Sequence, residues 1–305
     1  MYKDDAAMER RLPIISILTA GCLWGLMGIF TREMTAAGFD LSDTLIVRCS
    51  VACAAFGLTL LIRDKRLFRI KLRHVGIFAG AGICSMLFFT YSYFQCISIT
   101  SLSTAAILLY TSPSMVMLMS LFIFRERLTA IKIAALAMAF AGCVLVSGGG
   151  GGNVTVRGVV YGLCAGFGYA LYSIFARLLL NRGYDSRTVN FYAMLFAFAG
   201  ACFIWGCARP MTLMFSSGTG LLWSLCAGLV SCYLPYLLYT FGMTKVETGK
   251  ASVMASTEPV VATLMGALIY KERMPLVSVF GVLLVIGAVC ALNLNYTKRK
   301  ISLIP

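Results

Sequence analysis

The sequence predicts an all-α integral membrane protein whose ten transmembrane helices form two inverted five-helix repeats around a central cavity. Three observations predict this fold class: an apolar composition, ten long apolar runs and an internal repeat. Of the 305 residues, 60% are hydrophobic and 12% are charged, whereas a typical soluble domain has about 25% charged residues. So few charges cannot cover a soluble protein of this length. The composition also excludes a disordered chain and a small disulfide-stapled domain.

Ten runs are long enough to span a bilayer, since a helix needs about 20 mainly apolar residues to cross it. We expect the spans at residues 13–31, 42–62, 75–97, 102–124, 130–147, 158–176, 188–206, 220–242, 249–270 and 276–294. The glycine run in the middle of the chain predicts a flexible joint, and no Gly-Lys-Ser/Thr follows it, as a phosphate loop would require. We therefore divide the chain into a first repeat at 11–147, a Gly-rich linker at 148–157 and a second repeat at 158–297.

The distribution of Lys and Arg predicts the orientation. If the N-terminus is cytoplasmic, 20 of the 26 Lys and Arg side chains fall on the cytoplasmic side and five on the other, with Arg48 inside a span. Cytoplasmic loops of membrane proteins carry such an excess. We expect a multi-pass protein of the plasma membrane with both termini in the cytoplasm, and we assign the net charge of +14 to loops that face anionic lipid rather than nucleic acid.

The chain repeats itself at a fixed offset. Shifted by 146 residues, Ala105–Leu128 overlays Ala251–Met274, and a shift of 145 residues overlays Gly38-Phe39-Asp40 on Gly183-Tyr184-Asp185. Because five spans is an odd number, the second repeat enters the membrane in the opposite sense to the first. Inverted repeats recur in secondary transporters, where two similar halves can pack in two related ways.

Two Pro-centred spans that each end at a glutamate carry a family resemblance. They run from Thr111-Ser112-Pro113 to Arg125-Glu126-Arg127, and from Thr257-Glu258-Pro259 to Lys271-Glu272-Arg273. These segments resemble the paired domains of the EamA family of the drug/metabolite transporter superfamily. The resemblance covers nearly the whole chain. It implies ten helices around a central cavity and transport, usually export, of small metabolites, including amino acids. It implies a small-molecule substrate and the bilayer as partners, with a weak preference for protons as the coupling ion.

Glu258 is the sharpest candidate for substrate binding, because it lies near the middle of the ninth span. A carboxylate at that depth costs several kcal/mol unless it faces a cavity or a partner. It can bind a proton or a substrate ammonium in alternation, which would couple transport to proton exchange. The alternative is a structural glutamate that a neighbouring helix neutralises.

Arg48 is the other charge inside a span. It can recognise a substrate carboxylate, pair with Asp43 or Glu258, or snorkel to the outer interface, and snorkelling is the default expectation. If Arg48 and Glu258 face one cavity, they match the two ends of an amino-acid-like zwitterion.

Three prolines lie inside predicted spans, at Pro113, Pro235 and Pro259. A proline has no N–H for the carbonyl four residues earlier, so these residues free the carbonyls of Leu109, Ser231 and Ala255. A freed carbonyl in a membrane must meet water, a side chain or a ligand. The kinks therefore suit gates and binding sites, although simple packing kinks fit equally well.

Aromatic residues are the expected cavity wall. At the repeat offsets Trp24 aligns with Tyr169, and Tyr93 aligns with Tyr239; we add Tyr110 to this set, with Tyr172 and Tyr236 nearby. A tyrosine within a span needs a partner for its hydroxyl, and cavity water or substrate would supply one. Helix packing is the alternative for any single tyrosine.

Some remaining features favour structural roles. We expect Glu126 and Glu272 to cap the helices that follow their turns. The glycine spacings at Gly21, Gly25 and Gly28 predict a helix-packing face. The single histidine and the absence of a Cys-x-x-Cys pair argue against a metal site and a cofactor.

The function that these features favour is secondary active transport of small organic metabolites by alternating access. Efflux of cationic compounds by proton exchange is the alternative, and a channel fits poorly because channels usually need rings of charge or carbonyls. An enzyme is not expected, since catalysis in lipid calls for clustered His, Asp or Cys groups that the chain lacks. A monomer or a loose homodimer is the expected assembly.

Overall fold

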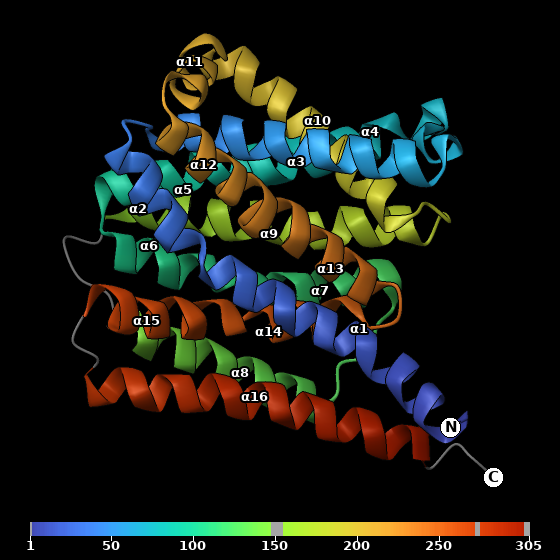
Figure 1. The fold of residues 1–305 in the computed structure, drawn as a ribbon. Helices are drawn as coiled ribbons and strands as arrows, with labels where there is room; N and C mark the ends of the chain where they lie inside the picture. Colours follow the sequence, from blue (N-terminus) through green and yellow to red (C-terminus); the bar gives the residue numbers. More distant parts are fainter. Residues whose placement is uncertain (1, 148–154, 272–274, 302–305) are drawn as a thin grey trace.

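The structure is a computed structural model that describes residues 2–147, 155–271 and 275–301, and every regular element in these ranges is helical. Eight helical stretches are long and apolar enough to cross a membrane, and two shorter apolar helices, Ala130–Val146 and Leu276–Leu292, accompany them. Together they account for the ten predicted spans. The first described helix begins, and the last described helix ends, at one end of the bundle, here called the terminal end; the opposite end is called the far end (Figure 1).

The first repeat contains spans one to five. Its helices are α1 (Tyr2–Gly25), α2 (Met27–Ala36), α3 (Leu41–Arg63), α4 (Val75–Ala79), α5 (Phe88–Ile99), α6 (Leu102–Leu109), α7 (Ser112–Phe124) and α8 (Ala130–Val146). A π-helical segment, η3 (Gly80–Leu87), joins α4 to α5. Two 3₁₀ turns, η1 (Lys65–Phe68) and η2 (Leu72–His74), lie between α3 and α4.

The second repeat follows the same order. Its helices are α9 (Val156–Leu180), α10 (Ser186–Trp205), α11 (Ala208–Ser216), α12 (Gly218–Gly228), α13 (Leu234–Met243), α14 (Thr248–Ala255), α15 (Thr257–Tyr270) and α16 (Leu276–Ile301). A second π-helical segment, η4 (Leu229–Tyr233), joins α12 to α13. Helix α1 runs from the terminal end to the far end and α9 runs back, so the two repeats are inverted (Figure 1).

Equivalent turns of the two repeats have the same backbone geometry. Gly38 and Gly183 have φ values of 91° and 82°, which favour glycine because it has no Cβ. Asp40 and Asp185 then cap α3 and α10 through their side chains. The residues that repeat in the sequence therefore form turns with the same backbone conformation and the same helix cap.

Besides the first span, which breaks at Leu26 between α1 and α2, four spans are interrupted near their middle. Helices α6 and α7 break before Pro113, and α14 and α15 break before Pro259. The third and eighth spans instead contain the wide turns η3 and η4, and η4 overlays Ile83–Leu87 at the offset of 146. Residues at all four of these interruptions line the pockets of the candidate site.

Helix α11 was not expected from the sequence, and it lies across the far end of the bundle (Figure 1). Its Arg209 guanidinium lies 2.5 Å from a carboxylate oxygen of Asp40 and 2.7 Å from one of Asp43. Burial of Asp40 opposes its ionisation. Hydrogen bonds from the Asp43 N–H and the Ser42 hydroxyl, together with the Arg209 charge, outweigh burial and lower the pKa of Asp40 to about 2. This ion pair holds α11 against the start of α3.

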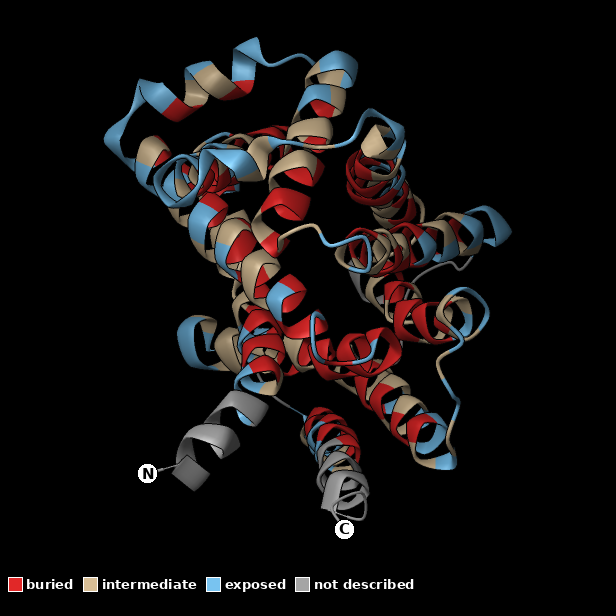
Figure 2. Ribbon diagram, turned by 90° about the vertical axis from the view of Figure 1, so that its right-hand side faces the viewer, coloured by how far each residue is buried: buried red, intermediate tan, exposed pale blue. Residues whose placement is uncertain are grey.

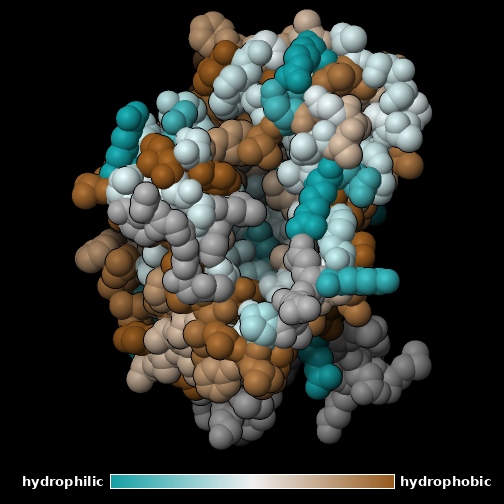
Figure 3. Space-filling model, turned by 90° about the vertical axis from the view of Figure 1, so that its left-hand side faces the viewer, coloured by the Kyte–Doolittle hydropathy of each residue, from teal (hydrophilic) through white to brown (hydrophobic). Residues whose placement is uncertain are grey.

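The two ends of the bundle differ. Figure 3, which faces the far end, shows a recess near its middle. Figure 2, which faces the terminal end, shows buried residues around the middle of the bundle. Val246 and Thr248, in the turn between α13 and α14 and at the start of α14, are 2% and 0% exposed. The interior is therefore closed from the terminal end and hollowed from the far end.

Candidate functional site

The break between α14 and α15 positions Glu258. This residue lies in the first turn of α15, where the partial positive charge of the helix N-terminus favours an anion. The Tyr169 hydroxyl donates a hydrogen bond to Glu258 Oε2 at 3.2 Å. Among the described residues this is the carboxylate's only hydrogen bond, so it keeps further capacity to bind a ligand.

Glycines let neighbouring helices approach both breaks. A Cβ on Gly21 of α1 would overlap the Thr257 hydroxyl and lie 3.1 Å from the freed Ala255 carbonyl oxygen. A Cβ on Gly166 of α9 would lie 2.9 Å from the Thr111 hydroxyl. Gly21 and Gly166 are equivalent at the offset of 145, as Thr257 and Thr111 are at 146. Each repeat thus packs its first helix against the broken span of the other.

The expected glycine face on α1 and α2 is only partly a contact surface. Gly25 lies against the α15 break, where an added Cβ would be 2.7 Å from the Glu258 carbonyl oxygen. Gly28 has nothing within 4 Å of such a Cβ. The helix boundary at Leu26 turns Gly28 away from the face that regular helical spacing predicts.

Arg48 reaches the carbonyl that Pro235 frees. Its Nη2 donates to the Ser231 carbonyl oxygen at 3.0 Å, and its buried Nε has no hydrogen-bond partner among the described residues. The side chain therefore points inward to the eighth span and does not simply snorkel to an interface. Arg48 replaces Ala193 of the other repeat and Glu258 replaces Ser112, so both charges break the symmetry of the repeats.

Glu258 and Arg48 line one pocket, called here the outer pocket, which has an empty volume of about 560 Å³. Its apolar wall comes from α1, α2, α3, η3, α5, α6, α9 and the eighth span. The lining residues are Trp24, Met27, Leu45, Arg48, Cys49, Met86, Phe89, Thr90, Leu109, Tyr169, Cys232, Tyr236 and Glu258.

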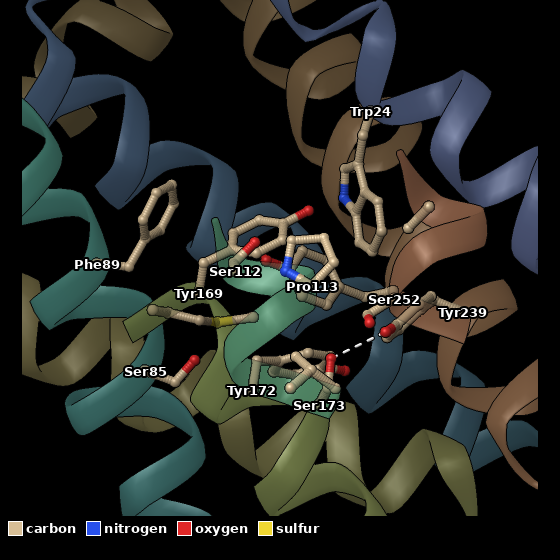
Figure 4. Close-up of a pocket in the computed structure, with 14 residues that line it drawn as sticks. Trp24, Ser85, Phe89, Ser112, Pro113, Tyr169, Tyr172, Ser173, Tyr239 and Ser252 are labelled. Carbon is tan, nitrogen blue, oxygen red and sulfur yellow. Dashed lines mark hydrogen bonds between the residues drawn. The ribbon is translucent and has the colours of Figure 1, made fainter. Parts of the chain in front are cut away.

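A second pocket, called here the inner pocket, has an empty volume of about 450 Å³ (Figure 4). It shares Trp24, Met86, Phe89, Tyr169 and Tyr236 with the outer pocket, so the two are parts of one cavity. Its other lining residues are Ser85, Ser112, Pro113, Val116, Tyr172, Ser173, Tyr239, Ser252 and Ala255. The Ser173 and Tyr239 hydroxyls are hydrogen-bonded at 2.9 Å, as the dashed line in Figure 4 marks.

Aromatic rings meet where the two pockets join. The Trp24 ring lies edge-on to Tyr236 with centroids 5.2 Å apart, and its centroid is 5.3 Å from that of Tyr239. Tyr169 completes the group at 6.5 Å from Trp24. The equivalent residues Trp24 and Tyr169 therefore face each other across the cavity.

Two of the predicted wall residues do not line either pocket. Tyr93 packs beside Phe89, with ring centroids 5.7 Å apart. Tyr110 packs with Cys143 and Val260 on the side of α8 and α16. The offset that pairs Tyr93 with Tyr239 predicts the depth of Tyr93 in the membrane. It does not predict the direction in which the side chain points.

Phe89, Met86 and Ser252 line the cavity but were not expected from the sequence. The chain has 20 phenylalanines and 16 methionines, so nothing in the sequence distinguishes these two. Ser252 lies two turns before Glu258 on the same interrupted span, which is a weak indication of a shared face.

Glu126 caps a helix of the other repeat, which corrects the expectation that it caps the next helix in sequence. Its carboxylate accepts hydrogen bonds from the Thr248 N–H at 2.7 Å and the Gly249 N–H at 3.1 Å. The next helix, α8, is capped by Thr129 instead. Glu272 lies outside the described residues. Among those residues no group of three or more His, Cys, Asp or Glu side chains could hold a metal ion.

The fold and the site define a multi-pass helical membrane transporter with a charged cavity between two related halves. The model of the EamA-like transporter family matches residues 11–148 and again 156–294. The chain belongs to this family, which is a family of transporters and not of enzymes.

Relatives and a solved structure agree with this assignment. An uncharacterized transporter of Archaeoglobus fulgidus is 26% identical over 65% of this chain and 69% of its own length. The uncharacterized transporter YxxF of Bacillus subtilis is 20% identical over 98% and 96% of the two chains. A crystal structure superposes on 94% of this chain and 98% of its own, with a TM-score of 0.77 at 18% identity, which shows a common fold.

Proposed function

We propose that the protein is a secondary active exporter of small organic metabolites, amino acids among them, that works by alternating access. The observation that carries this proposal is that Glu258 and Arg48 line the same pocket. Among the described residues, no other charged side chain lines either pocket. One cavity thus offers one carboxylate and one guanidinium.

The arrangement of these charges fits a zwitterion. Within the described residues neither charge forms an ion pair, so each can meet an opposite charge on a ligand. Glu258 would bind the ammonium, with aromatic faces nearby to add cation–π attraction. Arg48 would bind the carboxylate through its unpaired donors. The rest of the substrate would then lie in the inner pocket, against the aromatic rings around Trp24.

Alternating access follows from the inverted repeats. The conformation described here is hollowed at the far end, whereas Val246 and Thr248 are buried at the terminal end. With both termini in the cytoplasm, as the distribution of basic residues favours, this conformation faces outward. The related packing of the two repeats would open the cavity to the cytoplasm, where an exported metabolite enters.

Efflux of cationic compounds by proton exchange is the second candidate. The contact between Glu258 and the Tyr169 hydroxyl in an aromatic cavity suits a bulky cation as well as an ammonium. Arg48 argues against it, because a guanidinium in the same pocket repels a cation. In either case protonation of Glu258 would release the bound cationic group.

Ligand-induced thermal stabilisation tests the substrate class, since a ligand that binds the folded state raises the melting temperature. We expect amino acids to stabilise the purified, lipid-reconstituted protein. E258Q should weaken binding by about 10- to 100-fold, the effect of removing a hydrogen bond to a charged group. R48M should do the same for zwitterions. E33Q is the matched control, because the Glu33 carboxylate makes no hydrogen bond or ion pair within the described chain.

Each outcome separates the candidates. Stabilisation by organic cations that survives R48M but not E258Q would support cation efflux instead. Equal stabilisation of the wild type, E258Q and R48M by one metabolite would show that the substrate binds elsewhere.

A further inference from the structure

We propose that Glu126 and Arg177 are positioning residues of the transport cycle, which latch the start of α14 and keep the terminal end of the cavity closed. This inference rests on the proposed alternating access. The latch is defined here as Glu126, Arg177 and their contacts with Val246, Thr248 and Gly249. It joins the α7–α8 turn and the end of α9 to the turn between α13 and α14.

Helix α14 depends on Glu126 for its N-terminal cap. The residue at its own N-cap position, Glu247, makes no side-chain capping hydrogen bond. The Glu126 carboxylate instead bonds to the N–H groups of Thr248 and Gly249. A helix leaves its first four N–H groups without partners, and here a side chain 122 residues away in the sequence supplies two acceptors.

Arg177 fastens the same turn from α9. Its Nε donates to the Thr248 hydroxyl at 2.8 Å, and its Nη2 donates to the Val246 carbonyl oxygen. Glu126 and Arg177 also attract each other electrostatically. Glu126 therefore binds backbone donors, and Arg177 binds acceptors, of one short segment, Val246–Gly249.

An ion pair outside the latch adds to the closure. Lys132 Nζ lies 2.5 Å from a carboxylate oxygen of Glu247 and donates to the Arg127 carbonyl oxygen at 2.9 Å. Lys132 is buried while the Glu247 side chain is 51% exposed. An ion pair with such an exposed partner is weak, so Glu126 and Arg177 carry more of the attachment.

The latch lies directly between the cavity and the terminal end. Ser252, one turn beyond Gly249 on α14, lines the inner pocket, and its hydroxyl donates to the Gly249 carbonyl oxygen at 3.0 Å. A Cβ on Gly249 would lie 3.5 Å from the Met117 Cα of α7. Separating α14 from α7 at this point would therefore open the inner pocket to the terminal end.

Glu258 lies on the same interrupted span, just beyond the break at the end of α14. Helix α14 has eight residues, Thr248–Ala255, and α15 begins two residues later at Thr257. A movement of α14 therefore changes the wall of both pockets. The position of the latch couples closure of the terminal end to the geometry around the cavity carboxylate.

Thiol labelling from each side tests the latch without any substrate. The reporter for the terminal end is S252C, and the reporters for the far end are the native Cys49 and Cys232, which line the outer pocket. A charged, membrane-impermeant methanethiosulfonate is added from one side to vesicles of known orientation. Mass spectrometry then measures the modification rate at each cysteine.

We expect E126Q to raise the labelling rate of S252C from the terminal end by about tenfold, as loss of one charge-assisted hydrogen bond implies. Labelling of Cys49 and Cys232 from the far end should fall in the same sample. R177K keeps the charge but changes the donor geometry, and it should shift both rates in the same directions. E33Q, on α2 near the far end, is the control and should change neither rate.

Two results would overturn the proposal. An unchanged S252C rate in both E126Q and R177K would show that these contacts do not close the terminal end. Faster labelling at all three cysteines would show a general loss of packing, as a merely structural role predicts. Reciprocal labelling in a protein that transports no metabolite would leave the latch intact and overturn the proposed function alone.

Discussion

At the scale of single residues, Arg48 supplies the hydrogen bond that Pro235 removes from the eighth span. Pro235 leaves the Ser231 carbonyl without its usual donor, and Arg48 supplies one at 3.0 Å. A freed carbonyl and a guanidinium would each be costly in lipid. The sequence predicted the freed carbonyl and the buried charge separately, but it did not indicate that they meet, because 183 residues separate them.

Asp40 gives a prediction for the dependence of stability on pH. Its pKa is about 2 in the folded protein, below the ordinary value of 3.8 for an aspartate. Its ionised form therefore stabilises the fold above pH 3.8, and this contribution is lost as the pH falls toward 2. Asn still caps a helix well, so D40N removes mainly the charge. We expect D40N to be less stable by about 0.5 kcal/mol at pH 7, as for an exposed ion pair.

The difference between D40N and the wild type should vanish near pH 2. Thermal unfolding of both proteins between pH 2 and pH 7 measures it. A constant difference at every pH would show that the Arg209 pairing contributes nothing and that the capping geometry alone matters.

At the scale of elements, the interrupted spans explain which glycines are essential. G166A should destabilise the protein by about 1–3 kcal/mol, the usual cost of overpacking, because its Cβ would lie 2.9 Å from the Thr111 hydroxyl and 3.1 Å from the Leu108 carbonyl oxygen. G28A is the matched control, since it meets nothing within 4 Å and alanine favours a helix. Melting temperatures of the two variants measure the difference, and equal values would contradict the close packing at the breaks.

Element positions were predictable, whereas their internal geometry was only partly so. The ten apolar runs matched the helices because a bilayer imposes a minimum length. The prolines indicated the interruptions in the fourth and ninth spans. The wide turn η3 contains no proline, and α11 is only nine residues long, so neither produces a pattern that a search for long apolar runs detects.

At the scale of the whole molecule, the inverted repeat makes a topological prediction. Arg73 lies in η2 and Arg157 in the first turn of α9, and both are exposed. These two elements are at opposite ends of the bundle (Figure 1). We expect R157C to react with an impermeant thiol reagent in intact cells and R73C to react only after permeabilisation. Labelling of both cysteines from the same side of intact cells would contradict the inverted arrangement.

The cavity could be predicted in outline but not in detail. The repeat offset and the intramembrane charges indicated Trp24, Tyr169, Arg48 and Glu258, all of which line the outer pocket. Tyr93 was also selected by the repeat offset but packs beside Phe89, outside both pockets. Equivalent positions in the two repeats lie at a similar depth in the membrane, but small rotations of a helix decide which residues face inward.

The pairing of one guanidinium with one carboxylate also determines the electrical character of the cycle. Moving one elementary charge across 100 mV requires about 2.3 kcal/mol. A cavity whose two ionised groups, Arg48 and Glu258, sum to zero can carry a neutral dipolar solute without performing this work. The return step differs, because a proton on Glu258 leaves the charge of Arg48 uncompensated. Proton exchange by the wild-type protein should therefore be electrogenic, and an imposed diffusion potential should change its rate. A transport rate that does not depend on the potential would contradict proton exchange at Glu258.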